Sequence, residues 1–340
     1  MLEQAEACEQ MGAPLNGVIL RGAAADYAGR GPTYALMKHE AQARVGTAPA
    51  LRLAGALHRM VLERRAPELA TYYPSVGGSS AISGAWDAAR ALIEQQPDAL
   101  RERIALPIQT NEVGRAVALL SGLMHISRAV GQQPIRLLEV GASAGLTLRF
   151  DAFGYTSAGR EWGDLTGPVQ LRDPWSGSEP DLGARVSIVE RRGCDPHPID
   201  PLSTAGRLAL TSYVWPDQAA RFERLRGAIE LASRIPVTVD QASAADWVDQ
   251  QLGTSTSTVT VVWHSVVMQY LTRDERERLD TVLAVKGRPA PVWRLAYEPA
   301  HEAVNGMYFK LSATEYRADG TNSTTTIGHG GGHGPPFYLA

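Results

Sequence analysis

The chain has 340 residues, of which 44% are hydrophobic and 20% are charged, so it can bury a large core and its length suggests two domains. Its formal net charge of -3 provides no basic field for phosphates, which makes nucleic acid a poor default partner and favours a small-molecule ligand. The two cysteines lack metal-ligand spacing and no charged-then-apolar leader opens the chain, so we expect a cytoplasmic protein without a metal centre.

Helical spacing dominates residues 1–131, where few strand signals occur. Residues 51–63 have the pattern of an amphipathic helix, and the loop 72–80 after them is irregular because it contains proline and two glycines. This loop could close over a substrate through Tyr72, Tyr73 and Ser75, with Tyr73 as the candidate substrate contact. A packing surface between domains is the alternative interpretation.

A cluster of polar residues opens the helix that leads into the second half of the chain. We place the domain boundary there, which separates a helical cap domain of residues 1–108 from a second domain of residues 109–340. Helix capping explains one polar residue at this point but not a cluster of four. The candidate substrate contacts are Gln109 and Asn111, and a candidate proton acceptor is Glu112.

An apolar strand at residues 135–140 breaks into a loop of small residues at 141–145. The loop must turn sharply and let its backbone approach a ligand, which explains Gly141 and Gly145. Glu139, near the end of the strand, can accept hydrogen bonds or meet a cation. No lysine follows the glycines, as it does in the usual phosphate-binding loop, so we expect a nucleotide-like ligand that is poor in phosphate.

Strands and helices alternate after this loop, as a doubly wound sheet requires. The expected strands are residues 135–140, 186–190, 236–240, 258–264 and 291–297, and the expected helices are residues 146–151, 201–212, 217–233, 243–252 and 273–286. The most apolar stretch, residues 259–268, is too short to span a bilayer, so no membrane segment is expected. Residues 308–316 and 324–327 indicate an antiparallel ribbon, which the glycine-rich run 328–334 interrupts as a disordered hairpin tip.

The carboxyl ends of parallel strands share one edge of a sheet, where open α/β sheets bind their ligands. Polar residues that end the expected strands become neighbours there, namely Glu139, Glu190, Asp240, His264 and Glu298. His264 is the best candidate for proton transfer, because we expect it to emerge at this edge and imidazole titrates near neutral pH. A histidine that only hydrogen-bonds a neighbouring loop is the alternative. Asp195, His197 and Asp200 give a weak metal signal, so no metal is expected.

Five parallel strands, an antiparallel pair and an acidic, glycine-rich first turn resemble the Rossmann-like fold of class I S-adenosylmethionine-dependent methyltransferases, over roughly residues 110–340. Residues 139–145 match the motif acid-x-Gly-x-Gly-x-Gly except that Ser143 replaces the middle glycine. The resemblance implies S-adenosylmethionine as the cofactor. The residues it implies for cofactor binding are Glu139, Gly141, Ser143 and Gly145 in the loop, Glu190 for the ribose hydroxyls, and Asp246 with Trp247 for the adenine.

A narrower resemblance spans nearly the whole chain. Residues 72–78, 109–115, 138–146 and 193–200 resemble motifs of a bacterial family that is catalogued only as domain of unknown function two thousand three hundred and thirty-two. The chain departs from that pattern at Thr147, where we expect asparagine, and in its late glycine- and histidine-rich run.

The leading hypothesis is therefore a methyltransferase for a small molecule, in which the helical cap supplies substrate selectivity. One alternative keeps the fold and catalyses an elimination, cyclisation or hydrolysis of a small metabolite without a cofactor. Another is a catalytically idle subunit whose helical half binds a partner protein. The sequence leaves the acceptor and any homo- or hetero-oligomer open.

Overall fold

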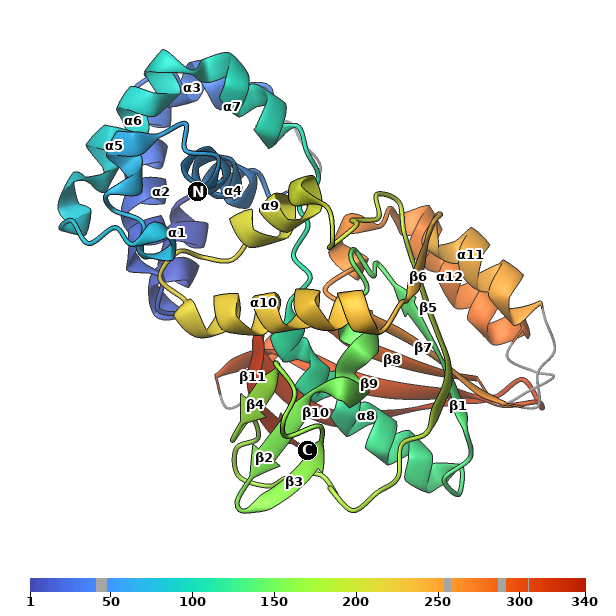
Figure 1. Ribbon diagram of the computed structural model, residues 1–340. Coiled ribbons are helices and arrows are strands. Elements are labelled where there is room, and N and C mark those ends of the chain that lie inside the picture. The colour runs from blue at the N-terminus through green and yellow to red at the C-terminus, as the bar shows by residue number, and fades with distance from the viewer. Residues whose placement is uncertain (41–47, 254–257, 287–291, 305) are drawn as a thin grey trace. The chain divides into compact units, whose positions relative to one another are not determined.

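The computed structural model describes residues 1–40, 48–253, 258–286, 292–304 and 306–340 (Figure 1). These residues form two compact units, each of which combines two segments of the chain. The helical unit comprises Met1–Thr110 and Pro201–Glu223, and the sheet unit comprises Asn111–Asp200 and Arg224–Ala340. The boundary expected at residue 108 lies close to the break at Thr110, whereas the return of residues 201–223 to the first unit has no counterpart in the sequence analysis.

The helical unit is built from short helices, many of which begin with proline. Proline suits the first helical position because it has no N–H and its φ is already helical. The helices are α1 (Leu2–Gln10), α2 (Pro14–Ala28), α3 (Pro32–Met37), α4 (Pro49–Leu62), α5 (Pro67–Ala70), η2 (Pro74–Val76), η3 (Ile82–Gly84), α6 (Ala85–Gln95), α7 (Pro97–Ile104), α9 (Thr204–Ser212) and the start of α10 (Ala219–Arg234). The predicted amphipathic helix is confirmed as α4, which buries Leu53, Leu57 and Met60 in the core of this unit.

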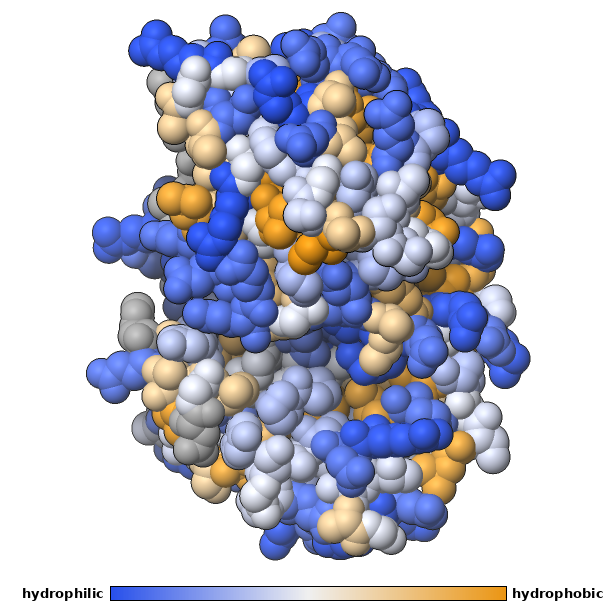
Figure 2. Space-filling view, turned by 90° about the vertical axis from the view of Figure 1, so that its left-hand side faces the viewer, coloured by the Kyte–Doolittle hydropathy of each residue, from blue (hydrophilic) through white to orange (hydrophobic). Residues whose placement is uncertain are grey.

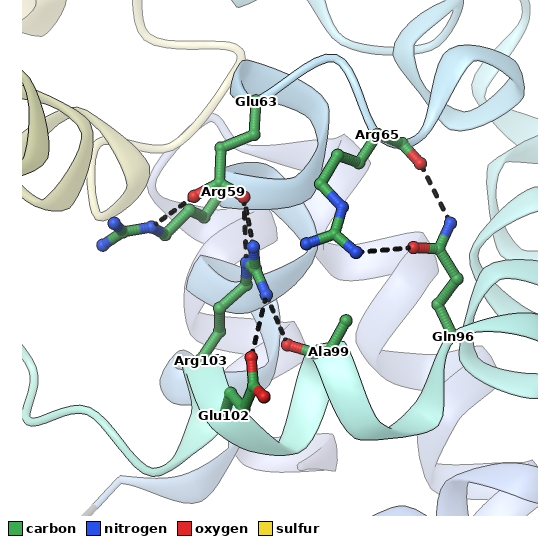
Figure 3. Close-up of polar contacts among 7 residues, drawn as sticks. All are labelled: Arg59, Glu63, Arg65, Gln96, Ala99, Glu102 and Arg103. Carbon is green, nitrogen blue, oxygen red and sulfur yellow. Dashed lines mark hydrogen bonds and ion pairs between the residues drawn. The ribbon is translucent and has the colours of Figure 1, made fainter.

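Polar contacts join the end of α4 to α7 (Figure 3). Arg59 Nε donates to Glu63 Oε1 at 2.8 Å, and Arg103 Nε donates to Glu63 Oε2 at 3.1 Å. Arg103 also donates to the carbonyl oxygen of Ala99 at 2.6 Å. Burial raises the pKa of Glu63, but the two guanidinium groups outweigh it and hold the pKa below its ordinary value. The carboxylate of Glu63 therefore ties two helices together.

The sheet unit contains an eight-stranded sheet with the order β11-β10-β9-β8-β7-β1-β5-β6. The strands are β1 (Ile135–Val140), β5 (Ile188–Asp195), β6 (Thr238–Gln241), β7 (Val259–Ser265), β8 (Val292–Val304), β9 (Met307–Tyr316), β10 (Asn322–Gly331) and β11 (Gly334–Leu339). Strands β6, β5, β1, β7 and β8 are parallel, while β9, β10 and β11 continue the sheet as antiparallel neighbours. The structure thus confirms a mixed α/β architecture with a large, mostly parallel sheet that is compatible with a Rossmann-like fold.

Helices cover this sheet on both faces (Figure 1). On one face, α11 (Ala244–Leu252) and α12 (Arg273–Lys286) bury Trp247 and Leu279 against Leu138 and Val140 of β1. On the other, α8 (Ala116–Ala129) packs against β8 to β11. Gly122 lets this helix come close, since a Cβ there would lie 2.7 Å from Leu295 Cδ2. Both faces of β1 are covered, so all of its residues are buried, including the charged Arg136 and Glu139.

Two parts of the sheet unit differ from expectation. Residues 153–172 form a separate small sheet, β3-β2-β4, with strands β2 (Gly154–Ser157), β3 (Arg160–Gly163) and β4 (Gln170–Arg172), which we did not predict. The antiparallel ribbon at the C-terminus is confirmed. The prediction that its glycine-rich run forms a disordered tip is wrong, because Gly328 and Gly330 lie within β10. A side chain at Gly328 would overlap the backbone of Tyr338, and one at Gly330 would approach the Tyr297 hydroxyl at 2.5 Å. Close packing, and not flexibility, therefore requires these glycines.

The surface carries isolated hydrophobic side chains among predominantly hydrophilic ones, as the face in Figure 2 shows. Scattered exposure of this kind is normal for folded domains. Among the residues that the structure describes, no helix is both long enough and apolar enough to cross a membrane.

Candidate ligand site at the switch point of the sheet

The parallel strands place a topological switch point beside β1. The connection from β1 leads to β5 on one side, while β7 and then β8 lie on the other side. Open α/β sheets bind their ligands outside the carboxyl ends of the strands at such a point. Val140, the last residue of β1, pairs with Cys194 of β5 and with His264 of β7, so these three strands end together. We call the loops that follow them, residues 141–146, 195–200 and 265–268, the switch-point site.

The loop after β1 has the sharply turning backbone that the sequence predicts. Gly141, Ser143 and Gly145 all have left-handed conformations, with φ of 69°, 52° and 62°. The sequence predicts that a ligand lies close to these glycines, but protein side chains lie there instead. A Cβ at Gly141 would overlap the side chain of Val267, and one at Gly145 would lie 3.0 Å from Val239 Cγ2. The left-handed Ser143 costs about 1 kcal/mol of strain, which the contacts around it must offset.

Oxygen atoms of the protein already accept the backbone N–H groups of this loop. Ser143 N donates to Asp195 Oδ2 at 2.9 Å, and His197 N donates to Asp195 Oδ1 at 2.8 Å. Leu146 N donates to Asn111 Oδ1 at 2.9 Å. In a phosphate-binding loop such N–H groups donate to the phosphate. Here two of them donate to the Asp195 carboxylate, which occupies the position that a phosphate would take. The arrangement therefore agrees with a ligand that is poor in phosphate.

Asp195 is the last residue of β5 at this edge, whereas the sequence predicts it in the loop after a shorter strand. We expected the second strand to end at Glu190, but β5 continues to Asp195. The available signal was Pro196, since proline cannot donate to a central sheet ladder and stops the strand directly before it. The apolar pattern of the strand ends before the charged residues 190–192, so the sequence predicts a strand end that is too early.

Glu139 is a buried acid near the end of β1. Its side chain is 3% exposed, and Thr147 Oγ1 donates to Oε1 at 2.5 Å. Trp263 faces Glu139 in the register of β1 and β7, and a hydrogen bond from its side chain lowers the pKa of the Glu139 carboxyl, although no bond to Oε2 meets strict hydrogen-bond geometry within the described residues. Burial raises the pKa of Glu139 to about 8. Near neutral pH this carboxyl is therefore mostly protonated, with a smaller ionised fraction.

His264 lies near the carboxyl end of β7, as expected, in register with Val140, but its ring is not exposed there for proton transfer. The ring is fully buried, with Nδ1 2.7 Å from Glu298 Oε1, and Arg294 Nε donates to Nε2 at 2.9 Å. Because Arg294 can only donate, Nε2 accepts and Nδ1–H donates to Glu298. Burial, followed by the charge of Arg294, lowers the pKa of His264. The neutral ring therefore links two charged side chains.

Glu298 carries this link into the loop after β7. Besides His264, its Oε1 accepts from Val267 N at 3.0 Å. The preceding residue, Val266, has a φ of 58°, which is strained for a β-branched side chain. Glu298 thus holds Val267 in the position where it covers Gly141.

The polar cluster before α8 reaches the site through only part of its residues. Asn111 contacts the loop after β1, as described, and Glu112 Oε1 caps the turn η4 (Val113–Arg115) by accepting from Gly114 N at 3.1 Å. Arg115 Nε donates to the carbonyl oxygen of Gly332 at 2.9 Å. The other two candidates for substrate contact, Gln109 and Tyr73, belong to the helical unit, where both are buried.

Three predicted cofactor contacts lie elsewhere. Glu190 pairs with Arg136 near the beginning of β1, and Arg136 Nε donates to it at 2.9 Å, so its expected place at the carboxyl edge is wrong. Trp247 is buried in the core with its indole N–H bonded to Asp240 at 2.7 Å, so it presents no free ring face. Asp246 is exposed on α11 and paired with Arg278.

The described residues contain no group of three or more histidine, cysteine, aspartate or glutamate side chains placed to hold a metal ion. A family model described as an uncharacterized protein conserved in bacteria, DUF2332, matches residues 1–338 of the chain. No curated protein and no solved structure matches the chain. The family match covers both the helical unit and the sheet unit, and its description states no reaction.

Proposed function

We propose that this chain, which belongs to the family of uncharacterized bacterial proteins DUF2332, is an S-adenosylmethionine-dependent methyltransferase that acts on a small molecule. The order of its parallel strands, with a switch point beside β1, supports a ligand at the carboxyl edge. An acid followed by a left-handed, small-residue loop at the end of β1 supports a nucleoside-like ligand there.

The main support for this proposal is that the switch-point site presents hydrogen-bond acceptors, whereas a phosphate site would present hydrogen-bond donors. Asp195 and Asn111 accept the N–H groups of the loop, and the buried carboxyl of Glu139 lies near the end of the strand before it. Carboxylates attract cations strongly in a partly buried site, where solvent screens them little. A ligand that carries a sulfonium and an ammonium group, and no phosphate, suits this chemistry.

The residues fit such a cofactor by their donor and acceptor chemistry. Glu139, Ser143 and Asp195 would hold it, and when bound it would supply an activated methyl group on the sulfonium. The protein would contribute mainly by orienting the acceptor and excluding water. Glu112 is the proposed proton acceptor. His264 acts in this proposal as a positioning residue, because both ring nitrogens are engaged and Glu298 passes its effect to Val267.

A cofactor-free reaction is the second candidate, and the raised pKa of Glu139 favours it. A carboxyl whose pKa is about 8 is well matched to donate or accept a proton near neutral pH. Elimination, cyclisation or hydrolysis of a small metabolite would use such a group. Turnover that depends on Glu139 but not on S-adenosylmethionine would favour this candidate.

Isothermal titration with S-adenosylmethionine and S-adenosylhomocysteine tests the proposal. The wild type should bind, and Glu139→Gln and Asp195→Asn should each weaken binding by about tenfold or more, which corresponds to about 1.4 kcal/mol. Glu190→Gln is the matched control, because Glu190 pairs with Arg136 near the beginning of β1 and its loss should leave binding unchanged. Absence of heat and of any thermal shift at high ligand excess would rule out the methyltransferase.

A further inference from the structure

A serine and a buried histidine meet in the helical unit. The Oγ atom of Ser75, in η2, lies 2.9 Å from Nε2 of His58, in α4. The other ring nitrogen of His58, Nδ1, lies 3.1 Å from the backbone carbonyl oxygen of Ser212, at the end of α9. A hydroxyl, an imidazole and a third group that orients the ring thus form a chain of hydrogen bonds.

The direction of these hydrogen bonds follows from the chemistry of the groups. A carbonyl oxygen can only accept, so Nδ1 of His58 must carry the proton. Burial lowers the pKa of His58 to about 4, so the ring is neutral near pH 7 and its Nε2 presents a lone pair. Ser75 must therefore donate its hydroxyl proton to Nε2. This is the polarity of a nucleophile and its general base.

The turn that carries Ser75 is rigid and reaches the surface. Gly78 N donates to the carbonyl oxygen of Tyr73 at 3.0 Å, and Gly78 packs so closely against the backbone of Ala70 that a Cβ could not fit. Tyr73 is buried, whereas Ser75 is half-buried between exposed neighbours. The turn thus holds Ser75 in one place, at a residue that is partly exposed to solvent.

We propose that Ser75 is a nucleophilic serine that His58 activates, and that it takes the acyl group of a small, uncharged carboxylic ester. The surroundings of the base favour such a group, because the rings of Tyr73 and Phe222 lie with their centroids 5.4 Å and 6.0 Å from that of the imidazole. Tyr73, the titratable side chain against the ring, stays neutral since burial raises its pKa. This centre is independent of the proposed methyltransferase.

The step balances without any further reactant. With p-nitrophenyl acetate as the probe, Ser75 Oγ bonds to the carbonyl carbon while its proton passes to His58 Nε2. The bond to the p-nitrophenolate oxygen breaks and that group leaves with the electron pair. His58 returns its proton to solvent, and water then hydrolyses the acetyl ester of Ser75. A base of low pKa without a carboxylate partner makes both stages slow.

Covalent labelling tests the inference on the full chain. An alkyl fluorophosphonate should form a Ser75 adduct, with loss of fluoride, at least about 100-fold faster than adducts at other serines, as general-base assistance implies. Peptide mass spectrometry locates the adduct. Ser75→Ala should abolish it, and Ser79→Ala, an exposed serine of the same loop, should leave it unchanged.

A second measurement covers the base. His58→Gln should slow labelling of Ser75 at least about tenfold while thermal unfolding confirms a folded protein, since glutamine cannot take the proton. If that variant does not fold, the wild type still decides through a p-nitrophenolate burst equal to one acetyl group per chain that Ser75→Ala lacks. A folded wild type that forms no Ser75 adduct, or that labels Ser75 and Ser79 equally, would overturn the inference. A purely structural Ser75–His58 bond predicts that inert outcome.

Discussion

Glu139 combines near-complete burial with one strong hydrogen bond from Thr147 and a second contact with the Trp263 indole. A buried acceptor that is poorly hydrogen-bonded costs about 1–3 kcal/mol, so a ligand that supplied a donor would gain binding energy. Protonation offers another way to lower that cost. The pKa of Glu139 is accordingly raised, and this residue couples ligand binding, charge and stability at the end of β1.

Stability should therefore fall with pH through this one residue. The pKa of Glu139 rises from its ordinary 4.5 to about 8 on folding, so the folded state holds a proton that the unfolded state loses between these values. Its contribution is present below pH 4.5 and is lost as pH rises through 8, by a few kcal/mol. Chemical denaturation of Glu139→Gln from pH 5 to 9 should lack this decline. Parallel pH curves for variant and wild type would contradict the burial argument.

The neutral ring of His264 stabilises two charged side chains, Glu298 and Arg294. His264→Ala should lower the free energy of unfolding by about 2–5 kcal/mol, because both charges lose a partner in a largely buried setting. Urea denaturation measures the change, with the half-exposed His329→Ala as control. A fully stable His264→Ala protein would show that the ring does not serve this structural role.

At the scale of elements, charged residues within a strand explain why the end of β5 differs from expectation. Strand β1 and helices α4 and α12 lie where the sequence predicts them, and α4 follows most directly because its apolar periodicity is strong. The end of β5 does not, because residues 190–192 are charged, and arginine and glutamate in a strand look like a loop when their partners across the sheet are unknown. Arg136 pairs with Glu190, and Asp240 pairs with Arg192.

The candidate site divides in the same way. The left-handed turn at Gly141 and Gly145 and the buried acid before it were predictable, since only small residues tolerate that backbone. The Asp195 carboxylate under Ser143, and Val267 over Gly141, depend on contacts between loops far apart in sequence. Local patterns do not specify such contacts.

Close packing at Gly141 can be separated from its backbone conformation. Gly141→Ala and Gly131→Ala both place a side chain on a left-handed residue, at φ of 69° and 67°, but only Gly141 faces another side chain, Val267. We expect about 1 kcal/mol of destabilisation at Gly131 and a further 1–3 kcal/mol at Gly141. Thermal unfolding of the two variants measures the difference. Equal losses would mean that Val267 moves aside without cost.

For the whole molecule, the helical unit depends on a segment that arrives late in the chain. Trp215 packs in a cluster with Ala5, Cys8 and Leu20, so residues 201–223 complete a core begun by the first helices. Nothing in the composition of this segment distinguishes it from the helices of the sheet unit. A unit assembled from two distant segments is therefore invisible to a linear scan for domain boundaries.

This dependence predicts an asymmetric response to two substitutions in the same segment. Trp215→Ala should destabilise the helical unit by about 3–5 kcal/mol, because it removes a buried ring from that core. Leu202→Ala, at a residue that is 44% exposed, should change stability by less than about 0.5 kcal/mol. Differential scanning calorimetry of both variants checks this. Similar unfolding temperatures for the two variants would contradict the claim that residues 201–223 complete the core of the helical unit.

The central claim is that a nucleoside-like cation without phosphate binds at the switch-point site, and hydrogen–deuterium exchange tests it most directly. With saturating S-adenosylhomocysteine, amides of residues 141–147 and 195–200 should exchange several-fold more slowly, while those of α4 and α7 keep their rates. Asp195→Asn should weaken this protection, and Glu190→Gln should preserve it. Unchanged exchange throughout the chain, or protection confined to the helical unit, would contradict the claim.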